Sequence, residues 1–145
     1  MTSKFYELIE HTADIGLRVF GKDAEGLFTN AATGMFDIIA KKKAGSGQPK
    51  TKARFFDIEL KARNREELLI AWLSELLSLS DVHKIIFNRA HIQQLTPKKI
   101  KARIGAERIT EHTYQLNTEI KAVTYHQLKI AKRKGRLQAE VIFDV

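Results

Sequence analysis

Residues 5–39 read FYELIEHTADIGLRVFGKDAEGLFTNAATGMFDII, and this stretch decides the fold. The segments 5–9 and 15–21 are strand-like, and the second alternates with the period of two that a strand with one buried face shows. Asp23 suits the N-cap of a helix, and from Leu27 onward apolar residues recur at helical spacing. The stretch therefore predicts two strands followed by an amphipathic helix with an aromatic core face.

The rest of the chain extends this pattern into one α+β domain that covers residues 1–145. Residues 41–54 are basic and hold two glycines and a proline, so we expect an exposed loop there. Asn64 followed by Glu67 resembles a capping box and predicts a second helix. Further strands are predicted at 54–62, 84–95, 98–109, 119–124, 127–132 and 137–144. We expect two main helices packed on a mostly antiparallel sheet, with a strand-rich region after residue 81.

Composition excludes several classes of protein. The 145 residues include no cysteine, which rules out disulfides, zinc-thiolate sites and a cysteine nucleophile. No apolar run reaches the roughly 20 residues of a membrane-spanning helix, and the N-terminus lacks a signal-peptide core. We therefore expect a cytoplasmic protein without a membrane partner.

Charge is distributed unevenly along the chain. The net charge is +8, yet residues 1–40 carry three basic and six acidic side chains, so the remainder carries +11. Basic stretches lie at 41–54, 98–103 and 129–136. This imbalance favours a polyanionic partner such as RNA, because counterion release drives binding to phosphates. Aromatic residues do not interleave these stretches, so base stacking has little support.

The sequence carries no familiar catalytic signature. It has no phosphate-binding glycine loop, no HExxH, no nucleophile elbow and no histidine pair spaced for zinc on a helix. We therefore predict no catalytic residue. A metal-dependent hydrolase would lack a base or nucleophile to accompany its carboxylates.

Two short polar segments between predicted strands are unusual. His11-Thr-Ala-Asp14 combines an imidazole, a hydroxyl and a carboxylate, and Lys121-Ala-Val-Thr124-Tyr-His126 resembles it in composition. Either segment could serve a site. On residue types alone, the structural explanation is favoured: Asp14 or Thr12 caps a turn, and His126 is a satisfied, partly buried histidine.

The C-terminus gathers two anionic groups, because Asp144 is followed directly by the terminal carboxylate of Val145. Anions this close repel unless a cation lies between them, and oxygen donors suit a hard ion such as Ca²⁺ or Mg²⁺. Asp14 would complete the set if its loop lies beside the last strand. Solvent-exposed carboxylates paired with a lysine explain the sequence equally well.

Several segments together resemble the archease family over essentially the full chain. The resemblance is carried by YELIEHTADIGLRV at 6–19, the helix at 69–77, EIKAVTYHQLK at 119–129 and the ending AEVIFDV at 139–145. It implies an α/β sandwich with a small strand-rich insertion. It also implies an accessory protein of the GTP-dependent RNA-splicing ligase, which promotes guanylylation and multiple turnover of that enzyme and can broaden its nucleotide use.

By the same resemblance, Asp14, Asp144 and the carboxylate of Val145 bind a divalent cation, with Ca²⁺ expected and Mg²⁺ or Mn²⁺ as alternatives. The motif positions His11, Lys121, Thr124 and His126 are expected near the same surface. The basic charge leaves a second hypothesis open, namely an RNA-binding or chaperone-like modulator of a tRNA-modifying enzyme that contacts tRNA itself.

Overall fold

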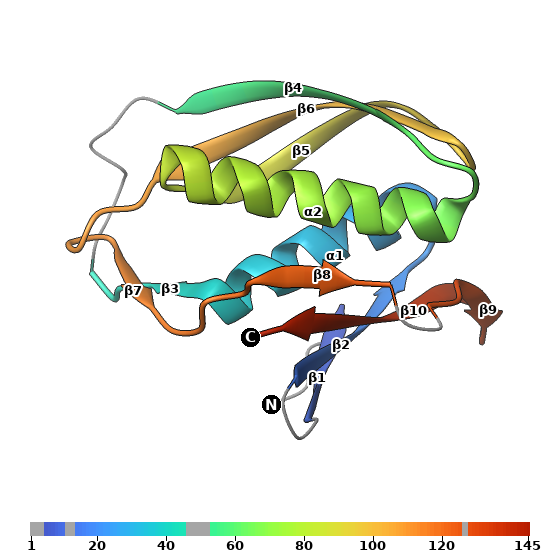
Figure 1. Ribbon diagram of the computed structural model, residues 1–145, viewed down its shortest axis with the longest axis horizontal. Helices are drawn as coiled ribbons and strands as arrows, with labels where there is room; N and C mark the ends of the chain where they lie inside the picture. The colour runs from blue at the N-terminus through green and yellow to red at the C-terminus, as the bar shows by residue number, and fades with distance from the viewer. Residues whose placement is uncertain (1–4, 11–13, 46–52, 126–127) are drawn as a thin grey trace.

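Two helices lie between two antiparallel sheets (Figure 1). The computed structural model describes residues 5–10, 14–45, 53–125 and 128–145. Its elements, in chain order, are β1 (Tyr6–Glu10), β2 (Asp14–Gly21), α1 (Ala24–Ile39), β3 (Ala40–Lys42), β4 (Arg54–Lys61), α2 (Arg65–His83), β5 (Ile85–Thr96), β6 (Lys99–Arg108), β7 (Tyr114–Leu116), β8 (Ala122–Thr124), β9 (Ala131–Arg133) and β10 (Arg136–Asp144).

The strands form one large sheet, one smaller sheet and a short ribbon. The large sheet has the order β1-β2-β10-β8, with β9 also paired to β10, and the small sheet has the order β4-β6-β5. The ribbon pairs β3 with β7. All the pairings in the described part of the chain are antiparallel, which confirms the predicted α+β class.

The strands after residue 81 do not stay together as one region. β5 and β6 join β4 above α2, whereas β8, β9 and β10 return to the sheet of β1 and β2 below α1 (Figure 1). The helices are thus covered on both sides by sheets. Local periodicity identifies strands but carries no information about which sheet each one joins.

Both helices begin where the sequence predicts. The Asp23 carboxylate accepts a hydrogen bond from the Gly26 amide at 2.8 Å, and Asn64 Oδ1 accepts one from the Glu67 amide at 2.9 Å. The capping box is half formed, because the Glu67 carboxylate pairs with Arg63 instead of reaching back to the cap. No helix in the described ranges is long and apolar enough to span a membrane.

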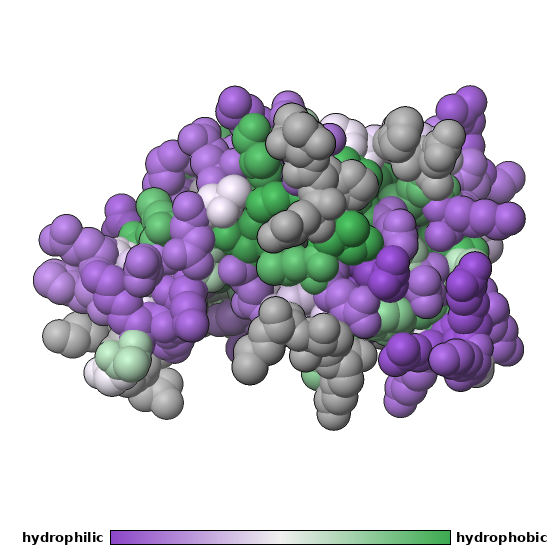
Figure 2. Space-filling model, turned by 90° about the horizontal axis from the view of Figure 1, so that it is seen from below, coloured by the Kyte–Doolittle hydropathy of each residue, from purple (hydrophilic) through white to green (hydrophobic). Residues whose placement is uncertain are grey.

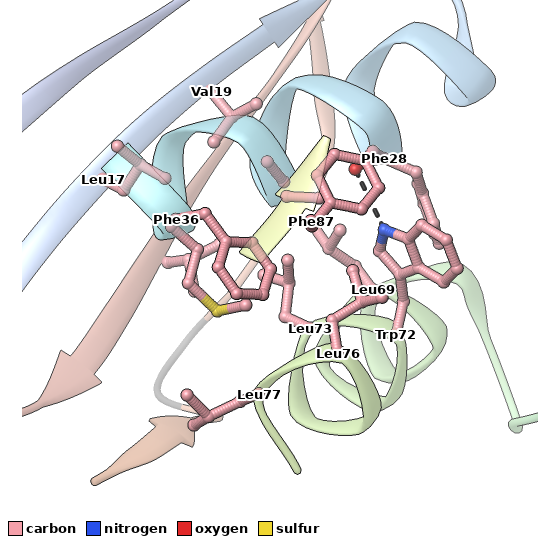
Figure 3. Packing of buried hydrophobic residues seen from close by; sticks show 14 of the residues in the cluster. Leu17, Val19, Phe28, Phe36, Leu69, Trp72, Leu73, Leu76, Leu77 and Phe87 are labelled. Carbon is pink, nitrogen blue, oxygen red and sulfur yellow. Dashed lines mark hydrogen bonds between the residues drawn. The ribbon is translucent and has the colours of Figure 1, made fainter. Parts of the chain in front are cut away.

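The core lies where the helices meet each other and the two sheets (Figure 3). Trp72 of α2 is fully buried, and its indole N–H donates to the Phe28 carbonyl of α1 at 3.0 Å. Phe36 of α1 stacks on Phe87 of β5 with ring centroids 5.9 Å apart. These contacts bind α1 both to α2 and to the small sheet.

Three predicted segments differ from the structure in extent. The 119–124 strand shrinks to β8, and the 127–132 strand shrinks and shifts to β9. The predicted loop at 41–54 is shorter, because Lys41 and Lys42 belong to β3 and Arg54 begins β4. β3 pairs with β7, more than 70 positions later in the chain, so no local pattern could reveal it.

Candidate functional site

Asp14 and Asp144 lie directly opposite each other at one end of the large sheet. Asp14 is the first residue of β2, Asp144 is the last of β10, and the antiparallel register makes them partners. Residues in such positions have Cα atoms about 4.5–5.5 Å apart and side chains on the same face. Asp14 is half-buried and Asp144 is exposed. The two carboxylates, 130 positions apart in sequence, thus share one surface.

The core fixes the register that brings these carboxylates together. On the helix-facing side of the two strands, Leu17 pairs with Val141 and Ile15 pairs with Phe143. Leu17, Val141 and Phe143 are fully buried. A slip of one residue would turn this whole apolar set toward solvent. Burial of the core side therefore holds the two carboxylates opposite each other on the outer side.

β8 borders the acidic pair from the other side of β10. Ala122 is the register partner of Asp144, and the Lys121 amide donates to the Asp144 carbonyl at 2.8 Å. The Thr124 hydroxyl donates to the Ile142 carbonyl at 2.9 Å. Lys121 and Thr124 are therefore next to the acidic pair.

Of the remaining predicted site residues, the structure describes Val145 but not His11 or His126. The Val145 side chain is partly buried and packs against the core cluster, so the end of the chain is held beside Asp144. His11 and His126 lie outside the described residues.

The acidic pair has the chemistry of a site for a hard cation. Within the described ranges, neither Asp14 nor Asp144 forms an ion pair with a basic side chain. Two facing carboxylates repel, and oxygen donors of this kind suit Ca²⁺ or Mg²⁺. No group of three or more His, Asp or Glu side chains that could hold a metal gathers in the described part of the chain, and the acidic pair supplies two carboxylate side chains. The predicted cation set, Asp14, Asp144 and the terminal carboxylate of Val145, stays a prediction, and the register places its two aspartates opposite each other.

Further along the same face, an ordered ion cluster joins three strands. Arg18 of β2 lies between its register partners Glu7 of β1 and Glu140 of β10. Its guanidinium donates to Glu140 at 2.8 and 3.0 Å and to Glu7 at 3.0 Å. The hydrogen bond to Glu140 contributes most to raising the pKa of Arg18. Arg18 is therefore neutralised locally and does not reach the acidic pair.

Sequence reasoning missed a second polar region on this side of the molecule. Figure 2 shows apolar surface in the middle of this side and strongly hydrophilic surface at the end where Figure 1 places β9. The sequence shows that the stretch 129–136 is basic, whereas the structure places it in a groove that also includes Arg18 and Phe20. The signal available was Lys134-Gly135, a two-residue turn that sets Arg133 opposite Arg136.

Known proteins resemble this chain over almost its whole length. The model of the archease protein family matches residues 6–145. A Methanosarcina mazei protein named archease is 36% identical over 98% of this chain and 97% of its own, and a Pyrococcus abyssi archease is 32% identical over 98% and 99%.

Solved structures agree with these relatives. The solution structure of a Methanobacterium thermoautotrophicum protein covers 99% of this chain and 100% of its own, with a TM-score of 0.73 and 31% identity. A Thermotoga maritima archease, described as a possible chaperone, has the same fold with a TM-score of 0.65 at 22% identity, over 99% and 100% of the two chains. With this architecture and these relatives, the chain belongs to the archease family.

Proposed function

We propose that this protein is a non-catalytic activator of the GTP-dependent RNA-splicing ligase. In this role it promotes guanylylation of the ligase's active-site histidine and sustains multiple turnover, and it broadens the ligase's nucleotide use. The single observation that carries the proposal is the register of Asp14 opposite Asp144. It supports the anionic tip that the family resemblance implies. We expect the protein to act in the cytoplasm with its ligase.

The proposed cation site uses Asp14, Asp144 and the terminal carboxylate of Val145. When bound, Ca²⁺, or Mg²⁺ or Mn²⁺ in its place, would offset the repulsion among three anionic groups. The chain's own contacts position the donors. The Lys121 amide holds the Asp144 carbonyl, and the Val145 side chain anchors the chain end on the core.

The tip is suited to enter a nucleotide-binding pocket of the ligase. It combines a strand end, a chain end and a β8 edge, and it presents carboxylates that no basic side chain neutralises within the described ranges. Such a tip could recruit or reposition a cation next to the ligase's histidine nucleophile. Lys121, exposed beside the tip, supplies a positive charge for an acidic residue or a phosphate of the partner.

The test is multiple-turnover joining of an RNA with a 2′,3′-cyclic phosphate end by the ligase of the same organism. The wild-type protein should convert a single-turnover ligase into one that turns over repeatedly. Asp14→Asn and Asp144→Asn should lose this effect while their melting shows a folded protein. Glu25→Gln, which changes an exposed carboxylate in the first turn of α1, should retain it as the control. Full activation by both tip variants would refute the role of the tip.

The second hypothesis is an RNA-binding or chaperone-like modulator of a tRNA-modifying enzyme. The Thermotoga maritima relative is described as a possible chaperone, which is the observation that favours it. It predicts no effect on a ligase shown to be active for one turnover, together with suppression of aggregation of the modifying enzyme on heating. That pair of results would replace the ligase proposal.

A further inference from the structure

A groove of about 610 Å³ lies on the outer side of the large sheet, next to the β9–β10 hairpin. It is lined by Arg133, Lys134 and Arg136 of the hairpin region, by Lys129 just before it, and by the ion cluster around Arg18. Four of these side chains are cations outside the ion cluster. The groove is therefore strongly positive.

In the described part of the chain, no carboxylate forms an ion pair with any of the four cations. The carboxylates that line it are Glu7 and Glu140, and both are bonded to Arg18. Among the described residues, Lys129, Arg133 and Lys134 form no ion pair with a carboxylate. Their charges are available to a ligand in the groove.

The hairpin turn holds two arginines against each other. Lys134 and Gly135 have φ of 52° and 77°, so the turn has two successive left-handed residues, as a type I′ hairpin requires. Arg133 and Arg136 are consequently direct register partners. Like charges opposite each other destabilise a strand pair, and a shared anion removes that penalty.

Arg136 is also fixed in orientation. Its guanidinium carbon lies 4.0 Å from the centroid of the Phe20 ring, so the planar group stacks on an aromatic face of β2. A stacked guanidinium keeps its N–H edges directed outward, where they match the oxygens of a phosphate. The groove thus offers a pre-oriented donor beside a second arginine.

We propose that this groove binds the phosphate backbone of RNA. An acidic protein surface is the competing partner, but protein interfaces depend on buried apolar anchors. Apart from alanines, the apolar side chain that lines this groove is Phe20, which Arg136 covers. Phosphate contacts need cations rather than apolar anchors. The choice of RNA over other polyanions rests on the proposed function.

The groove and the acidic tip lie at opposite ends of one strand. β10 runs from Arg136 to Asp144, and the rise of about 3.4 Å per residue in an antiparallel strand separates these residues by roughly 27 Å. This distance exceeds the Debye length of about 8 Å at physiological salt, so the acidic pair does not repel a phosphate in the groove. RNA at the groove would leave the tip free for the ligase.

The test is binding of a short fluorescein-labelled single-stranded RNA to the full chain without ligase, followed by anisotropy at several salt concentrations. The binding constant K for RNA falls as salt rises, so a plot of log K against log salt has a negative slope. The triple variant Arg133→Gln, Lys134→Gln, Arg136→Gln should reduce the magnitude of this slope by about 2, since each phosphate contact with a single strand contributes about 0.7. At about 0.1 M salt this slope change corresponds to an affinity loss on the order of 100-fold.

A matched triple variant removes the same charge from the small sheet. Lys61, Lys98 and Lys101 are exposed there, and replacing all three by glutamine should leave the affinity within a few-fold of the wild type. Equal losses in the two triple variants would show diffuse attraction and overturn the groove. Absence of RNA binding by the wild-type chain would overturn it as well.

Ligase assays separate this inference from the proposed function. If the hairpin variant loses binding to the ligase but keeps its affinity for RNA, the groove contacts an acidic protein surface and the RNA proposal fails. If the hairpin variant loses RNA binding as expected but still activates the ligase on a short substrate, the inference holds separately from activation. A wild-type chain that binds RNA through the groove but never activates the ligase refutes the proposed function alone.

Discussion

Replacing Asp144 by asparagine should stabilise the protein in the absence of calcium, whereas in the presence of calcium the variant should be less stable than the wild type. Asp14 and Asp144 are opposite partners without a neutralising basic side chain in the described ranges, so they repel in metal-free protein. A like-charge pair directly across two strands costs about 0.2–1 kcal/mol. Asp144→Asn keeps the size and backbone of the residue and removes this repulsion. Without calcium, the variant should therefore be the more stable protein.

The size of the shift follows from chain length. Unfolding entropy of about 2.1 cal/mol/K per residue gives about 0.3 kcal/mol/K for 145 residues. Relief of the repulsion then raises Tm by up to about 3 °C in EDTA. Calcium at 100 times its Kd stabilises the wild-type protein by about 2.7 kcal/mol, or about 9 °C. The variant should gain little, so the order of the two melting temperatures inverts.

The assay is calorimetric melting of both proteins in EDTA and across a calcium titration. Glu25→Gln is the control, because it removes an exposed carboxylate in the first turn of α1 that forms no ion pair within the described ranges. It should retain the full calcium-induced rise. A wild-type Tm that does not respond to calcium would refute the cation site. A variant less stable than wild type in EDTA would refute the repulsion.

Three further predictions concern other parts of the fold. Burial and a hydrogen bond to Asp37 raise the pKa of Tyr6 to about 12, so the stability that this group contributes is complete below pH 10 and is lost as the pH rises toward 12. In urea unfolding at alkaline pH, Tyr6→Phe should therefore lose less stability with rising pH than the wild type. An unchanged dependence of the unfolding free energy on pH would contradict this prediction. Tyr114→Phe removes the hydroxyl that donates to buried Glu107 at 2.8 Å and should lower the free energy of unfolding by about 1–3 kcal/mol, whereas a neutral effect would mean that water replaces the donor. A Cβ at Gly21 would lie 2.3 Å from a backbone nitrogen of α1, so Gly21→Ala should destabilise by about 1–3 kcal/mol or more in the same assay, and a variant as stable as wild type would show that α1 can move away.

The helices were predictable because their signals are local. Asp23 and Asn64 accept hydrogen bonds from amides three residues later, and apolar residues recur with the helical period on the buried side of each helix. The partner of the Glu67 carboxylate was not predictable in the same way. Arg63 competes for it from outside the helix, and a two-pronged guanidinium bond prevails over the cap.

Strands were predictable in kind but less so in extent. The alternation of β10 matches its buried and exposed sides closely, and that of β6 does so from Lys99 to Ile104, after which residues 105–107 are all buried. β3, β8 and β9 have three residues each, too few for a period of two to stand out. Their bounds depend on the partner strand, which is distant in sequence for β3 and β8.

The sequence by itself determined the order of the two helices and of the longer strands, the excess of positive charge beyond residue 40 and the residue types suited to a cation. Tertiary structure decided which of those residues meet. Asp14 faces Asp144 because burial of Leu17 and Phe143 allows one register, and Arg136 stacks on Phe20 because β10 lies next to β2. The reason is physical: propensity and capping act within a few residues, whereas strand pairing is selected by the free energy of burying the whole core.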